Sequence, residues 1–198
     1  MKKLISAAAL ATATLSSPAL AQDAGFEGGR VELLGGYDIV EGDEGFVYGI
    51  AAGYDVAVGQ GVIGVEAELN DSTVREVYSD ALVAGDELEI GAGRDIYVGA
   101  RLGFAAGPRT LLYAKAGYTN GAIDIAYDDG TTADKARVKG DGYRVGAGIE
   151  QKLKLFGEGS YGKVEYRYAN YGNVEYAGTS VAANIDRHQV LFGLGLRF

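Results

Sequence analysis

The feature that most constrains the fold of this chain is the alternation of apolar and polar or small residues in eight separate stretches. A period of two indicates β-strands whose two faces meet different surroundings, whereas an amphipathic helix would show a period of 3.6. In the last stretch, Val190, Phe192 and Leu194 alternate with Leu191 and glycines. The eight stretches are residues 29–39, 46–58, 62–69, 95–104, 111–118, 142–150, 162–170 and 190–198.

The connections between these stretches alternate in length, which indicates an up-and-down order. Residues 59–61 and 106–110 are short turns, and 151–161 is somewhat longer. The other connections are polar segments near residues 40–45, 70–90, 120–141 and 171–187. Outer-membrane barrels show this asymmetry, with short turns at one rim and longer loops at the other. The pattern predicts an all-β fold: an eight-stranded antiparallel up-and-down β-barrel, either a transmembrane β-barrel or a soluble one.

The first 21 residues have the features of an export signal and are excluded from this fold. Lys2 and Lys3 precede an apolar stretch, and the small-residue site "SPALA" predicts cleavage after Ala21. We therefore predict two parts, a cleaved signal at 1–21 and one barrel domain at 22–198. Cleavage removes two of the 18 basic residues and none of the 27 acidic ones, so the net charge changes from −9 to −11.

The composition excludes several classes of function. A chain this acidic lacks the basic surface that phosphate binding requires, so we expect no nucleic-acid partner. The absence of cysteine excludes disulfides and thiolate metal sites. After the signal, no apolar run approaches the roughly 20 residues of a transmembrane helix. The 32 glycines lie within the alternating stretches rather than in linkers, which also disfavours helix.

Alternation alone does not decide which face points outward, because a soluble lipocalin-like barrel and a membrane barrel are inversions of each other. The polar face favours the membrane barrel. It combines glycines with seven cations and eight anions, which could pair in a narrow lumen, and it includes Asp38 and Asp55. The predicted luminal charge network comprises Arg30, Glu32, Glu66, Glu68, Asp95, Arg101, Lys115, Arg144, Glu150, Lys163, Glu165, Arg167 and Arg197.

Aromatic residues on the apolar face gather at the strand ends, as the interfacial girdles of a membrane barrel do. Near the long-loop rim we expect a first girdle that also includes His188, and near the short-turn rim a second one. The first comprises Tyr37, Phe46, Tyr48, Tyr118, Tyr143 and Tyr168, and the second comprises Tyr54, Phe104 and Phe198.

The signal, the eight strands, "VEYRYANYG" at 164–172 and "FGLGLRF" at 192–198 together resemble the small OmpA-like, porin-family barrels of Gram-negative outer membranes. The resemblance covers residues 22–198. It implies residence in the outer membrane with both termini in the periplasm, among lipids and lipopolysaccharide. It also implies insertion by the outer-membrane assembly machinery, which recognises a terminal aromatic, here Phe198. The sequence lacks the periplasmic peptidoglycan-binding domain of full-length OmpA, so we do not expect cell-wall anchoring.

No residue pattern points to catalysis, a cofactor or a metal. His188 is the single histidine, and "DRHQVLF" offers no neighbouring serine for a base–nucleophile pair. Acidic segments such as "DDGTTADK" do not have the spacing of an EF-hand loop. The glycine-rich "GAGRDIYVG" lies within a strand and not before a helix, so it is not a phosphate loop.

The luminal charges are compatible with two functions. If they form a static ion-paired plug, the protein is a non-enzymatic surface protein that supports envelope integrity and presents acidic loops. If they line a narrow pore, the protein is a porin-like channel for ions or small solutes. The oligomeric state is open, with a monomer as the expectation.

Overall fold

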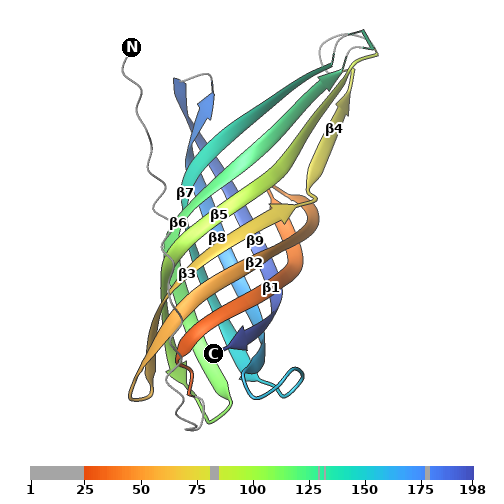
Figure 1. The fold of residues 1–198 in the computed structure, drawn as a ribbon. Coiled ribbons are helices and arrows are strands. Elements are labelled where there is room, and N and C mark those ends of the chain that lie inside the picture. Colours follow the sequence, from red (N-terminus) through yellow and green to blue (C-terminus); the bar gives the residue numbers. More distant parts are fainter. Residues whose placement is uncertain (1–24, 81–84, 129, 132, 177–178) are drawn as a thin grey trace, which may run out of the picture.

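The computed structural model describes residues 25–80, 85–128, 130–131, 133–176 and 179–198 (Figure 1). The predicted signal and the cleavage site after Ala21 lie outside the described residues. Among the residues described, no helix is long and apolar enough to cross a membrane. The strands are β1 (Gly28–Val40), β2 (Asp43–Val58), β3 (Gly61–Ser72), β4 (Arg75–Ser79), β5 (Glu87–Ala105), β6 (Thr110–Asp128), β7 (Ala133–Lys152), β8 (Ser160–Tyr176) and β9 (Thr179–Arg197).

The strands close into a barrel in which every neighbouring pair is antiparallel. Consecutive strands pair in order, β1 pairs with β9, and β3 pairs with β5 to close the ring. The short strand β4 continues β3 after a break at residues 73–74 and pairs with the upper part of β5. Counting β3 and β4 as one interrupted strand gives eight positions around the ring, so the predicted eight-stranded barrel is confirmed.

The two ends of the barrel differ strongly. The inner end carries Gly28, Phe198 and the short turns after β2, β5 and β7. At the outer end, β5, β6 and β7 extend well beyond the ring and form a four-stranded surface sheet with β4 (Figure 1). Register shifts interrupt the pairing between Ala92 and Asp95 and between Asp141 and Gly142. Such bulges increase local twist, and these lie where the sheet leaves the barrel.

The predicted outer loops are wrong in extent. Residues 40–45 contain only a two-residue turn, in which Glu41 and Gly42 have φ values of 49° and 102°, as a tight hairpin turn with two positive φ angles requires. Most of residues 120–141 belongs to β6 and β7, and parts of 70–90 and 171–187 belong to β3, β4, β5, β8 and β9. Alternation continues in parts of these segments, as in Leu88 and Ile90 against Glu87 and Glu89, but the runs are short and lie within polar sequence, so they were assigned to loops.

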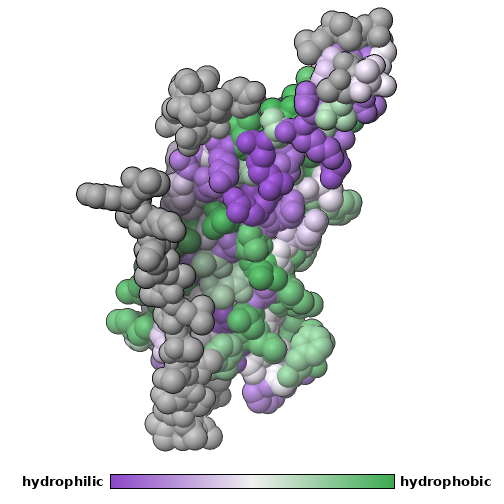
Figure 2. All heavy atoms as spheres, turned by 45° about the horizontal axis from the view of Figure 1, so that its top comes forward, coloured by the Kyte–Doolittle hydropathy of each residue, from purple (hydrophilic) through white to green (hydrophobic). Residues whose placement is uncertain are grey.

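The apolar face points outward, as predicted. Leu33, Phe46 and Phe192 are 68%, 69% and 62% exposed, while the alternate residues face the interior. Figure 2 shows hydrophobic side chains on the flank of the barrel and hydrophilic ones gathered over its outer end. Of the predicted girdle residues, Tyr168 is half-buried, and the exposed ones are Tyr37, Phe46, Tyr48, Tyr54, Phe104, Tyr118, Tyr143 and Phe198.

The interior contains two small apolar clusters besides its polar side chains. Leu34, Val47, Ala51 and Leu191 form one cluster. Phe26, Val62 and Leu111 form the other at the inner end, and the carbonyl oxygen of Phe26 accepts a hydrogen bond of 3.0 Å from Arg197 Nη1. The segment before β1 therefore helps to fill the inner end of the lumen.

Candidate functional site: the charged barrel interior

All thirteen residues of the predicted luminal charge network have their side chains inside the barrel. They alternate with outward-facing apolar residues along the strands, so the pleat directs them inward. Twelve are buried, and the side chain of Arg197 at the inner end is 6% exposed. They contact one another across the lumen from opposite walls.

Glu68 is the centre of the network. Its carboxylate forms ion pairs with Lys115, Arg144 and Arg167, from β6, β7 and β8, and the Arg144 Nη1–Glu68 Oε2 distance is 3.3 Å. Asn70 Nδ2 donates a further hydrogen bond of 3.1 Å to the same side chain. One carboxylate on β3 thus forms ion pairs with side chains from three strands on the far side of the barrel.

Lys115 extends this centre toward the inner end. Its Nζ lies 2.8 Å from Glu66 Oε1 and 2.7 Å from Glu165 Oε1. Glu66 also accepts Arg30 Nη1 at 2.6 Å, and Arg30 pairs in turn with Glu32. Each charged group therefore has at least one opposite partner, as burial of ions requires.

The inner layer of the network joins the first and last strands. Arg197 Nη1 lies 2.8 Å from Asp55 Oδ2, and Arg197 Nη2 lies 2.8 Å from Glu150 Oε1. Arg101 pairs with the same Glu150 at 2.6 Å. Lys163 pairs with Glu32.

The outer layer depends on a residue that the sequence analysis missed. Arg187 lies within 2.9 Å of Asp38 and 3.1 Å of Asp95, and Arg144 pairs with Asp95 at 2.6 Å. Arg187 continues the inward parity of Gln189 and Leu191, so starting the last predicted strand three residues earlier would have identified it. It was assigned instead to the preceding loop.

With Arg187, Asp38 and Asp55 included, the ion pairs join eight cations to eight anions in the described lumen. We call these sixteen residues the ion-pair column. It comprises Arg30, Arg101, Lys115, Arg144, Lys163, Arg167, Arg187 and Arg197 with Glu32, Asp38, Asp55, Glu66, Glu68, Asp95, Glu150 and Glu165. Its formal charges cancel.

Four tyrosines fill the space between the charges, and each packs over a glycine. A Cβ at Gly148 would lie 2.6 Å from the Tyr113 hydroxyl, and one at Gly121 would lie 2.9 Å from the Tyr171 ring. Tyr97 and Tyr161 cover Gly99 and Gly195 in the same way. Tyr113 Oη donates to Glu165 at 2.7 Å, and the Arg101 guanidinium carbon lies 3.9 Å from the centroid of the Tyr113 ring. The luminal glycines thus make room for the tyrosine rings.

His188 lies outside this network. It is exposed on the outer face, with Nδ1 2.8 Å from Tyr166 Oη and its ring centroid 5.1 Å from that of Tyr168. Within the part of the chain that the structure describes, no group of three or more histidine, cysteine, aspartate or glutamate residues is arranged to hold a metal ion.

Comparison with known proteins agrees with this architecture. Residues 7–198 match the family model of the outer membrane protein beta-barrel domain. The chain belongs to this family. Membership places it in the outer membrane, where the outward-facing apolar belt meets lipid and the charged column fills the lumen.

The curated relatives are named as outer-membrane proteins of Brucella species. The 25 kDa outer-membrane immunogenic protein of Brucella abortus is 34% identical over 76% of this chain. The aligned region covers 64% of that relative, so the chain spans less than two thirds of its length. The 31 kDa outer-membrane immunogenic protein of Brucella melitensis is 28% identical over 84% of this chain and 71% of the relative.

Two solved structures share the fold at low sequence identity. Neisserial surface protein A superimposes with a TM-score of 0.55 at 16% identity, covering 86% of this chain and 97% of that one. Ail, the attachment invasion locus protein of Yersinia pestis, has a TM-score of 0.53 at 13% identity, covering 87% and 99%. Both similarities show the barrel fold alone.

The surface sheet carries its own exposed ion pairs above the membrane. Arg137 Nε lies 2.5 Å from Asp124 Oδ1, and Arg75 pairs with Glu89 at 2.7 Å. The hydrogen bonds from Arg137 lower the pKa of the Asp124 carboxyl. Exposed pairs of this kind contribute little to stability, so the ion-pair column is the stronger candidate for a functional or structural role.

Proposed function

We propose that this member of the family is a non-enzymatic surface protein whose barrel is a closed, ion-paired anchor. The observation that carries the proposal is the ion-pair column, which links all eight positions of the ring and has no net charge. A filled, rigid lumen suits an anchor that holds the surface sheet at the cell exterior and supports envelope integrity. The same filling opposes the passage of solutes.

Contact with lipopolysaccharide is part of this proposal. A groove on the outer side of the surface sheet lies beside the exposed girdle residue Tyr48 and is lined by Arg75, Lys135 and Arg137 together with Asp71, Glu89 and Asp124. Glu89 and Asp124 pair with Arg75 and Arg137, so Lys135 is the cation best placed to meet a lipid phosphate. Cations just above an aromatic girdle lie at the height of lipid headgroups, where they attract anionic phosphates.

A narrow channel is the second candidate, and one observation favours it. Several buried donors in the described lumen, among them Arg30 Nη2, Arg101 Nε and Arg144 Nε, make no hydrogen bond to another protein group. Buried polar groups without a protein partner usually bond to water, so donors of this kind favour a hydrated path through the lumen.

We expect the purified protein to give negligible conductance in planar lipid bilayers, because the ion-pair column spans the lumen. Replacement of Arg101 or Glu66 by alanine should then produce conducting events, since each removal opens space and leaves an opposite charge unpaired. The measurement is single-channel current at fixed voltage. Steady openings of the unmodified protein that change with Arg101→Ala or Glu66→Ala would instead establish the channel.

We also propose that Phe198 is the recognition signal for the assembly machinery. The residue is 64% exposed, and its backbone pairs with Gly29 through hydrogen bonds of 2.9 and 3.0 Å. The residue therefore lies at the β1–β9 seam that closes the barrel, and recognition there would couple delivery to closure.

Phe198→Ala is expected to lower the amount of folded protein in the outer membrane several-fold. The measurement is fractionation followed by gel migration with and without boiling. Phe104→Ala is the matched control, because it removes another exposed aromatic at the inner end without touching the terminus. An equal loss in both variants would assign the effect to the girdle and refute a terminal signal.

A further inference from the structure

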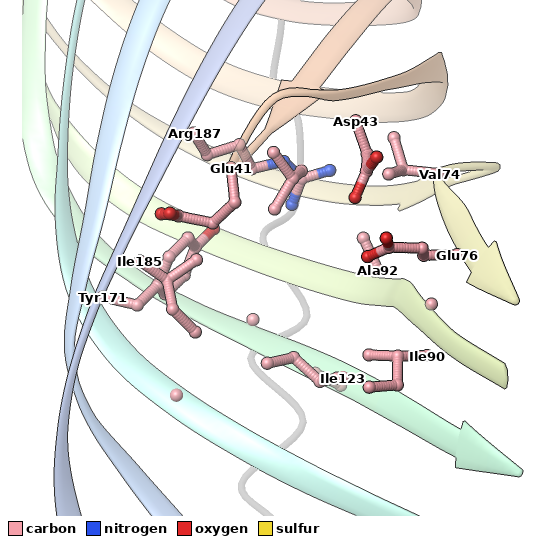
Figure 3. Close-up of a pocket in the computed structure, with 15 residues that line it drawn as sticks. Glu41, Asp43, Val74, Glu76, Ile90, Ala92, Ile123, Tyr171, Ile185 and Arg187 are labelled. Atoms are coloured by element: carbon pink, nitrogen blue, oxygen red, sulfur yellow. The ribbon is translucent and has the colours of Figure 1, made fainter. Parts of the chain in front are cut away.

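A cavity of about 230 Å³ lies at the outer mouth of the barrel, directly above the ion-pair column (Figure 3). Its walls come from the β1–β2 turn, from the break between β3 and β4, and from every strand except β3. The lining is mainly apolar and includes Val74, Ile90, Ile123 and Ile185. The cavity is smaller than the sites that hold drug-sized molecules, so its size suits a small ligand.

The floor of the cavity offers no unpaired charge among the described residues. Arg187 is there, but its guanidinium already bonds to Asp38 and Asp95. Tyr171, which also lines the floor, donates its hydroxyl hydrogen to Asp95. The ion-pair column therefore closes the inner end of the cavity with a neutral surface whose polar groups are already bonded. An anionic group of a ligand would find no free cation there.

The opposite end of the cavity is acidic. Asp43 from β2 and Glu76 from β4 direct their carboxylates toward each other, whereas Glu41 lies on the side of Arg187 and accepts a hydrogen bond from the Asp186 backbone N–H (Figure 3). Desolvation and the closeness of Glu76 raise the pKa of Asp43. Two carboxylates held together in this way repel each other unless a proton or a cation lies between them.

We propose that this cavity binds a small amphipathic cation, with its ammonium group between Asp43 and Glu76 and its apolar body against Ile90, Ile123 and Ile185. The chemistry of the lining selects this class. An anion would meet the carboxylates of Asp43 and Glu76, and a neutral apolar molecule would leave this pair of like charges without a compensating cation. A bare metal ion would lie against an apolar wall with too few ligands, since the described residues offer no cluster able to hold one. This role goes beyond anchoring and does not depend on it.

The test uses the whole folded protein in a non-ionic detergent, with 2-phenylethylammonium as the probe and 2-phenylethanol as its neutral counterpart. Backbone amide NMR shifts of Ile90, Ile123 and Ile185 report on the cavity itself and not on uptake of the probe by micelles. We expect saturable shifts with the ammonium compound and at least tenfold weaker binding of the alcohol.

Matched variants separate the cavity from general surface charge. Asp43→Asn and Glu76→Gln should each weaken binding of 2-phenylethylammonium about tenfold or more, and Ala92→Leu should abolish it by filling the cavity. Glu44→Gln removes a charge next to Asp43 that does not line the cavity, and it should change the affinity less than twofold. Equal affinity for the alcohol, undiminished binding by Asp43→Asn and Glu76→Gln, or an equal loss in Glu44→Gln would each overturn the proposal.

Discussion

Glu68→Gln is expected to lower the free energy of unfolding by about 3 kcal/mol, because loss of one partner from a buried ion pair leaves its opposite charges uncompensated. Glu68 has three cationic partners, and the substitution gives the ion-pair column a net charge of plus one. The shape of the side chain is kept, so packing changes little. The measurement is urea-induced unfolding in lipid vesicles, followed by the gel migration of folded and unfolded forms.

A second substitution tests whether charge balance is the cause. Lys115→Met alone should also destabilise the barrel, whereas the Glu68→Gln/Lys115→Met double variant should be at least 1 kcal/mol more stable than the sum of the single effects predicts. Glu44→Gln, on the exposed side of β2, should change stability by less than about 0.5 kcal/mol. A Glu68→Gln effect as small as this control would mean that water already screens the charges.

Gly36→Val is expected to destabilise the barrel by about 3 kcal/mol or to prevent its folding, because the interior has no space at this position. A Cβ at Gly36 would lie 2.8 Å from the Leu191 Cα and closer still to the carbonyl oxygen of Val190. These are backbone atoms of the neighbouring strand β9, which cannot move without breaking the pairing that closes the barrel.

Gly35→Val is the matched control on the same strand. A Cβ at Gly35 would meet no atom within 4 Å, and its strand partners Tyr48 and Phe192 are exposed on the lipid-facing side. Valine there should change stability by less than about 0.5 kcal/mol. Similar losses in both variants would contradict the assignment of the two faces, since neighbouring residues in a strand differ only in the side they present.

The barrel could be predicted from sequence because lipid imposes a strict rule on one face of each strand. Leu33, Leu102 and Leu194 mark that face, and their neighbours then point into the lumen. The thirteen predicted luminal residues followed directly from parity. Balanced charges and abundant glycine identified the inside, since a soluble barrel would have placed the charges in water.

The parts that could not be predicted lie where this rule ends. Above the girdle the apolar runs are short and lie among charged residues, as Ile123 and Ile125 lie beside Asp124, so the outer parts of β6 and β7 were assigned to a loop although they pair with each other. Arg187 was missed for the same reason. Its neighbours Asp186 and His188 are polar as well, so the sequence shows no alternation that would mark Arg187 as inward-facing. The two-residue turn at Glu41 depends on backbone angles that a polar sequence does not reveal.

The cancellation of charge inside the barrel has an electrostatic consequence at the cell surface. Since the ion-pair column contributes no net charge, the whole excess of negative charge in the chain belongs to residues outside it. The electric potential that an approaching polycation meets is therefore set by the exposed strands and turns alone. Substitutions there can change the sign or strength of that potential without disturbing the charges that hold the barrel together.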